Sequence, residues 1–236
     1  MILTAGKVHR VGDAEGVHAR FQPVSVRAPA PLAPELLAGL GGEGWGVAAV
    51  VDAPRAFHAQ WSSAWKEYRY RLATGPVPAA WEGLVWESAT HPRLAGRRID
   101  LGKVRRALER AVGTRDFFAL HAPSSVRRPR TLERVSWWER DGVVEVGLRG
   151  DAFGRYGVRL LVGGAVLVGA GIVEPENWDR ALDTATVFAG LRAPAAGLTL
   201  WEVGYPAALD PFAGVSPRFP GEPPFVPLDQ AWGGTT

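Results

Sequence analysis

Residues 66–72 have the sequence Lys-Glu-Tyr-Arg-Tyr-Arg-Leu. Aromatic or aliphatic side chains alternate with charged ones, so Tyr68, Tyr70 and Leu72 share one face of an extended chain and the charged residues share the other. A period of two is typical of a β-strand whose two faces meet different surroundings. The sequence therefore predicts a strand over residues 66–72 with two unlike faces.

Helices are predicted at four places along the chain. Asp100 is a suitable N-cap for a helix that carries apolar residues at helical spacing and ends near Gly113. The almost wholly apolar residues 155–170 predict a second helix, and Pro175 opens a third. Pro34 is well placed as the first residue of a short fourth helix, which a run of glycines ends.

Further strands are predicted between and after these helices. Residues 137–148 predict a hairpin with Asp141-Gly142 as its turn. Residues 46–51 predict a buried strand, and residues 198–205 predict a final one. Because strands and helices alternate irregularly along the chain, the pattern predicts a fold of mixed α and β structure.

Composition indicates a folded protein without redox chemistry. The 236 residues are 47% hydrophobic and 22% charged, so the chain can form a substantial core. It has no cysteine, which excludes disulfides, zinc–thiolate sites and cysteine nucleophiles and suits a reducing compartment. The longest apolar run, residues 160–173, is shorter than the roughly 20 residues that cross a bilayer. We expect a soluble, cytoplasmic protein without a membrane partner.

Two segments resemble motifs of one enzyme family. Residues 12–19, Gly-Asp-Ala-Glu-Gly-Val-His-Ala, resemble Gly-Arg-Thr-Asp-Ala-Gly-Val-His-Ala, the signature loop of the TruA-type tRNA pseudouridine synthases, with Glu15 inserted. Residues 57–62, Phe-His-Ala-Gln-Trp-Ser, and the alternating strand after them are similar to the family's Phe-His-Ala-Arg-Phe-Ser and Arg-x-Tyr-x-Tyr. The second match is the more specific.

Later segments continue the resemblance in the same order as in the family. The whole resemblance covers about residues 5–206. Residues 113–118 resemble the family's Gly-x-His-Asp-Phe, and residues 130–132 resemble the Thr-Arg that follows it. Residues 153–163 resemble Phe-Leu-x-x-x-Val-Arg-x-Leu-Val-Gly, and residues 193–206 resemble the family's C-terminal region.

The chain departs from the family at its N-terminus. Members usually carry some tens of residues before the signature loop, whereas this chain begins almost at the loop, so we expect an incomplete first half-domain. The arginine two places before the catalytic aspartate is replaced by Val11, with Arg10 adjacent. An ungapped alignment to the end of the loop places Ala14 at the aspartate's position.

The resemblance implies an α+β fold of the pseudouridine synthase type. This fold has a mixed, mainly antiparallel sheet with helices on its outer side and a central cleft. We expect a pseudouridine synthase-like catalytic domain over residues 1–206. Residues 207–236 are rich in proline and predict a C-terminal tail with little regular structure.

The implied activity is isomerisation of uridine to pseudouridine in the anticodon stem-loop of tRNA. Asp13 is the candidate nucleophile, Arg159 its ion-pair partner within salt-bridge reach, and Tyr68 the aromatic side chain that lies against the flipped uracil. On the residues alone, Asp13 is also compatible with a solvated loop position, Tyr68 with the core, and Arg159 with solvent or another acid. The alternative function is a catalytically inactive TruA-like protein that binds RNA.

The expected partners are tRNA and a second copy of the chain in a homodimer. A basic cluster supplies candidate phosphate contacts, although such a run taken alone is more often an ordinary solvated face: Arg127, Arg128, Arg130 and Arg134. No cofactor is implied. No metal site is predicted either, because neither His18 nor His58 has a ligand at metal-binding spacing.

Overall fold

The computed structural model describes residues 16–26, 33–42, 45–77, 79–122, 125–140, 142–184, 188 and 190–215. Within these ranges the chain forms a seven-stranded sheet in the order β1-β9-β4-β8-β7-β6, with β5 also paired to β4. The pairs β4–β8, β4–β9, β7–β8 and β6–β7 are antiparallel, and β1–β9 and β4–β5 are parallel. The predicted mixed, mainly antiparallel sheet is confirmed.

The bounds of the elements follow. The strands of the large sheet are β1 (His18–Ala19), β4 (Trp65–Ala73), β5 (Trp86–Glu87), β6 (Gly113–Arg115), β7 (Arg130–Arg140), β8 (Val143–Gly150) and β9 (Leu198–Gly204). A separate pair comprises β2 (Gly41–Gly42) and β3 (Trp45–Gly46). The α-helices are α1 (Pro34–Ala38), α2 (Leu101–Arg110), α3 (Gly157–Gly169) and α4 (Pro175–Thr184), and short 3₁₀ turns lie at Ala79–Trp81, Ser88–Thr90 and Phe117–Leu120.

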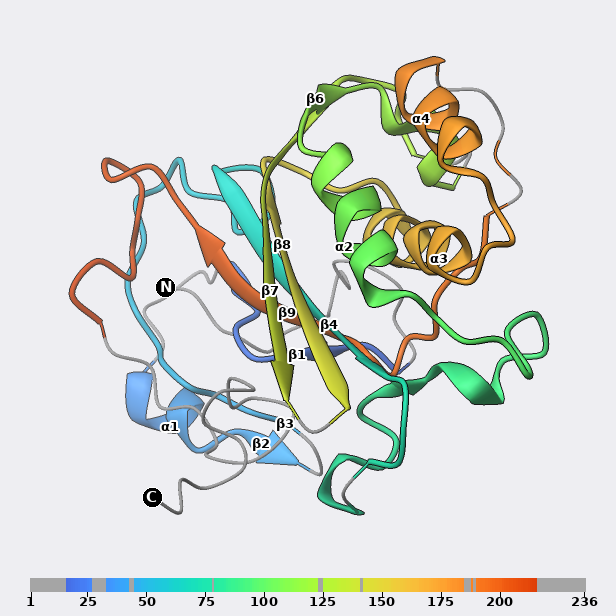
Figure 1. The fold of residues 1–236 in the computed structure, drawn as a ribbon. Coiled ribbons are helices and arrows are strands. Elements are labelled where there is room, and N and C mark those ends of the chain that lie inside the picture. The colour runs from blue at the N-terminus through green and yellow to red at the C-terminus, as the bar shows by residue number, and fades with distance from the viewer. Residues whose placement is uncertain are drawn as a thin grey trace.

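Helices cover one face of the sheet. Figure 1 shows α2 and α3 side by side against that face, with α4 beside them. Tyr68, Tyr70 and Leu72 of β4 point into the core between sheet and helices, where each is at most 5% exposed. The alternation that predicted β4 therefore also identified its core face.

Two local predictions are confirmed in atomic detail. The Asp100 carboxylate accepts a hydrogen bond from the Lys103 amide at 3.0 Å and so caps α2. Strands β7 and β8 form the expected hairpin, and Gly142 at its turn has φ 76°, which favours glycine.

Glycines in α3 allow close packing. A Cβ on Gly163 would lie only 1.8 Å from the carbonyl oxygen of Leu191, and one on Gly164 would lie 2.4 Å from the Trp178 ring. Both glycines let α3 approach its neighbours more closely than any larger residue could. The Gly163-Gly164 pair thus serves helix packing.

One predicted strand is wrong, and the expected tail is only partly described. The expected buried strand over residues 46–51 is reduced to β3 at its start, and residues 47–50 have no regular structure and are half-buried. The beginning of the tail packs on the core, because the Phe212 ring lies 5.1 Å from the Phe21 ring. The remainder, residues 216–236, lies outside the described residues.

Candidate functional site

A cleft of about 1140 Å³ opens where β4 and α3 begin. Its walls come from β4, the β8–α3 connection, the first turn of α3, the loop before β7, the loop before β9 and the loop before β4. Val17, just before β1, also lines it. The cleft therefore gathers segments from both ends of the described chain.

The cleft is strongly cationic. Six of its lining residues carry basic side chains: Lys66, Arg128, Arg130, Arg155, Arg159 and Arg192. The positive end of the α3 dipole lies at the same place, because Gly157 begins the helix and lines the cleft. Such a concave cationic surface attracts phosphate groups.

Asp151 is the one carboxylate among the described residues that line the cleft. Its Oδ1 atom accepts hydrogen bonds from the backbone amides of Thr131 at 2.8 Å and Ala152 at 2.6 Å. These bonds tie the start of β7 to the β8–α3 connection. Through its Oδ1 atom, Asp151 thus helps to hold the cleft wall together.

Tyr68 is one of the residues that line the cleft and is only 5% exposed. Its ring packs edge-on against Phe153 at a centroid distance of 5.4 Å. Burial raises the pKa of the Tyr68 hydroxyl well above its usual value, so the phenol stays protonated at neutral pH. It can therefore offer an aromatic surface and a hydroxyl donor, but no general base.

Arg159 projects from the first turn of α3 into the same cleft. Its Nε atom donates a hydrogen bond to the carbonyl oxygen of Ala193 at 2.6 Å. This bond fixes the base of the guanidinium against the loop before β9. The structure thus brings Arg159 of α3 and Tyr68 of β4 to one cleft.

Tyr156, which was not predicted from the sequence, lies close to three of the arginines that line the cleft. It precedes α3 with φ 65°, an unusual backbone conformation for a bulky residue and one that often marks functional sites. The guanidinium carbons of Arg155, Arg159 and Arg192 lie 4.8, 5.8 and 4.6 Å from the centre of its ring. Only its place inside residues 153–163, the segment that resembles a family motif, hinted at a role.

Asp13 lies outside the described residues, so its predicted approach to Arg159 stays a prediction. The described chain begins at Gly16, and Val17, four residues after Asp13, lines the cleft. The parallel pairing of His18 with Thr199 of β9 fixes the position of this segment.

The four arginines of the basic cluster lie in three places. Arg128 and Arg130 line the cleft. Arg130 is only 6% exposed and donates to the carbonyl oxygens of Arg128 at 3.1 Å and Val126 at 2.7 Å, so it shapes the loop that presents Arg128. Arg127 instead pairs with Asp116 at 2.5 Å.

Arg134 lies on the opposite face of the sheet from Tyr68. It pairs with Glu67 at 3.0 Å, and Glu67 alternates with Tyr68 along β4. The structure therefore brings two of the four predicted arginines to the cleft and leaves Arg127 and Arg134 away from it.

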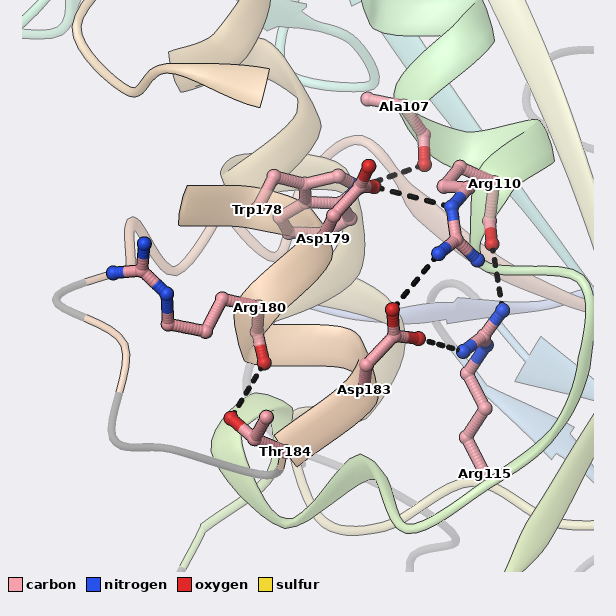
Figure 2. Close-up of polar contacts among 8 residues, drawn as sticks. All are labelled: Ala107, Arg110, Arg115, Trp178, Asp179, Arg180, Asp183 and Thr184. Atoms are coloured by element: carbon pink, nitrogen blue, oxygen red, sulfur yellow. Dashed lines mark hydrogen bonds and ion pairs between the residues drawn. The ribbon is translucent and has the colours of Figure 1, made fainter. Parts of the chain in front are cut away.

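Residues 113–118, which resemble a family motif, help to hold the helices against the sheet. Figure 2 shows Asp183 of α4 between Arg115 of β6 and Arg110 of α2, with an ion pair to each. The indole of Trp178 donates to the carbonyl oxygen of Ala107 at 2.9 Å beside this network. These contacts bind α4 to α2 and β6, and none of these residues lines the cleft.

The described residues contain neither a metal cluster nor a membrane span. No three histidine, aspartate or glutamate side chains in the described ranges lie close enough together to hold a metal ion. None of the helices there is long and apolar enough to cross a bilayer.

The family model described as tRNA pseudouridine synthase matches residues 107–206. A protein named tRNA pseudouridine synthase A from Roseiflexus castenholzii is 32% identical over 81% of this chain and 72% of its own length. Proteins of the same name from Thermosynechococcus vestitus and Streptomyces avermitilis are 32% and 33% identical, over 84% and 81% of this chain and 70% and 69% of their own lengths.

Proposed function

Because the chain belongs to the tRNA pseudouridine synthase A family, we propose that it isomerises uridine to pseudouridine in tRNA. The observation that carries the proposal is the cationic cleft, in which Tyr68 and Arg159 converge beside Val17. The cations suit a polyanionic substrate, and the buried tyrosine suits a base turned out of its stack.

The reaction changes the atom of uracil to which the ribose is attached, within one nucleotide. The bond from C1′ of the ribose to N1 of uracil breaks, the base rotates, and C1′ bonds to C5 instead. The proton lost from C5 is balanced by one gained at N1, so the reaction needs neither an oxidant nor a cofactor. It needs a carboxylate as nucleophile and a closed pocket that holds the detached base.

The proposed roles follow from position. Asp13 supplies the carboxylate, and the support is that Val17, four residues after it, lines the cleft. Arg159, fixed at its Nε by Ala193, keeps that carboxylate ionised and oriented. Tyr68 lies against the uracil, and the cations at the rim bind phosphates.

We also propose a substrate region, an assembly and a location. The target uridines lie in the anticodon stem-loop, the enzyme works as a homodimer in which RNA contacts both subunits, and it acts in the cytoplasm. The support is the family resemblance and, for the location, the absence of cysteine from the whole sequence.

Incubation with unmodified tRNA tests the proposal. Pseudouridine has the same mass as uridine, so mass alone does not detect it. Unlike uridine, it keeps a carbodiimide adduct that stops primer extension. The expected result is a new stop in the anticodon stem-loop that depends on the protein. A preparation that binds tRNA and leaves every uridine unchanged would overturn the catalytic proposal in favour of an inactive RNA-binding relative.

Arg128→Ala is expected to weaken tRNA binding and reduce its salt dependence. Arg128 is exposed at the cleft, and each lost phosphate contact flattens the slope of log K against log salt by about 0.7–1. Arg134→Ala is the matched control, because it removes an exposed arginine from the opposite face of the sheet. The measurement is a titration of tRNA binding at several salt concentrations. An equal decrease in the slope of log K against log salt for both variants would contradict the assignment.

A further inference from the structure

Trp61 projects from the loop before β4 and is 81% exposed. It lines the cleft together with Gln60 and Ser63. A single exposed apolar side chain is common and needs no explanation. The Trp61 ring does need an explanation, because its support is rigid and it lies at the cleft.

His58 supports the Trp61 ring from one side. The imidazole and indole rings are stacked, with centroids 4.2 Å apart and planes 12° apart. The His58 Nδ1 atom accepts hydrogen bonds from the backbone amides of Gln60 and Trp61, each at 3.2 Å. These bonds lock the imidazole in place, so one face of the indole is covered by a fixed partner.

The loop that carries both rings is itself tied down. The His58 amide donates to the Ser62 hydroxyl and the Ser62 amide to the His58 carbonyl, each at 2.9 Å. The Tyr205 hydroxyl donates to the carbonyl oxygen of Ala59 at 2.7 Å, and Phe57 packs against the Tyr205 ring at 4.8 Å. The indole is therefore presented by a rigid support, and little conformational entropy is lost when its open face is covered.

The surroundings of Trp61 are cationic. Lys66, whose amine donates to the Ser63 hydroxyl at 2.6 Å, lines the cleft beside this loop, and Arg128 and Arg155 line it as well. An aromatic face among phosphate-binding cations is the arrangement by which proteins hold single-stranded RNA, because every base has a face to stack. A protein partner would require these cations to be matched by acids.

We propose that Trp61 is a stacking platform for a nucleobase of the substrate RNA next to the target uridine. This inference rests on the proposed function of the cleft. The indole takes the base on its open face, while His58 holds the opposite face. Trp61 is then a positioning residue that fixes the register of the RNA relative to Tyr68.

Abasic substitution tests the proposal directly. Anticodon stem-loop RNAs with one loop base removed at a time are titrated against the unmutated chain and against Trp61→Ala, Trp61→Phe and Trp45→Ala. Trp61→Ala is expected to weaken binding of the intact RNA roughly 10- to 100-fold, and Trp61→Phe to keep most of the affinity. Trp45→Ala, which removes a 52% exposed tryptophan of β3 that does not line the cleft, is expected to have no effect.

The decisive result is a dependence on one base. At a single loop position, removal of the base should weaken binding by the unmutated chain as much as Trp61→Ala does, and should not weaken Trp61→Ala further. Losses that add at every position, or unchanged affinity of Trp61→Ala, would overturn the platform. An unmutated chain that binds and converts tRNA separates that outcome from failure of the proposed function, whereas one that binds no RNA would overturn both.

Discussion

Replacing Asp13 with asparagine is expected to lower the rate of pseudouridine formation by about 10⁴-fold or more, while the affinity for tRNA stays within a few-fold. The amide keeps the shape of the carboxylate but loses the nucleophile. Binding depends on the cations of the cleft and on aromatic side chains, which the substitution leaves in place. The rate is measured by carbodiimide labelling and primer extension, and the affinity by titration.

The neighbouring acid in the same loop provides the control. Glu15 is the inserted residue of the signature loop, and an ungapped alignment would leave Ala14 at the position of the aspartate. Glu15→Gln should therefore keep most of the activity if Asp13 is the nucleophile. An inactive Glu15→Gln together with an active Asp13→Asn would transfer the role to Glu15, and two active variants would refute a nucleophile in this loop.

Periodicity and capping predicted most of the scaffold. The alternation in β4, the N-cap at Asp100 and the turn before β8 are local signals, and each has a local physical cause that tertiary packing reinforces. The residues of the cleft followed only from the family resemblance. Tyr68 and Arg159 lie far apart in the chain, and no local pattern tells that a strand and a helix will bring them together.

The failures share a physical reason. Residues 46–51 are apolar enough for a buried strand, but strand formation also needs a paired neighbour, which sequence spacing cannot supply. Trp61 and Tyr156 were missed because their importance lies in exposure and in backbone conformation. Local sequence indicates which residues share a face, and only the fold determines what covers it.

The charged face of β4 is the clearest example. The sequence predicts that Glu67, Arg69 and Arg71 lie opposite the tyrosines, and a charged face of a strand is usually solvated. In the structure Arg71 is 1% exposed, and Glu145, opposite it on β8, is fully buried. The guanidinium carbon of Arg69 lies 3.8 Å from the centre of the Trp201 ring and 4.6 Å from the centre of the Trp138 ring. Tryptophan rings therefore cover these charged groups.

Glu145 holds this cluster together. Its Oε1 atom accepts a hydrogen bond from Arg69 Nη1 at 2.8 Å, and its other oxygen forms an ion pair with Arg71. Removal of one member of a buried ion pair leaves the partner's charge without compensation in a low-dielectric environment, at a cost of about 3–5 kcal/mol. Here Arg69 and Arg71 would both lose this carboxylate, and Arg69 would keep its ion pair with Glu67 at 3.5 Å.

Glu145→Gln is therefore expected to lower the free energy of unfolding by about 3–5 kcal/mol. Glu133→Gln is the matched control, because Glu133 of β7 is 40% exposed in its pair with Arg149 and such pairs contribute at most about 1 kcal/mol. Urea titration followed by circular dichroism should show a lower midpoint for Glu145→Gln with an unchanged slope. Because Glu145 lies on the sheet face opposite Tyr68, the fraction that remains folded should bind tRNA normally. Equal stability of the two variants would mean that the tryptophans, and not the carboxylate, keep Arg69 and Arg71 in place.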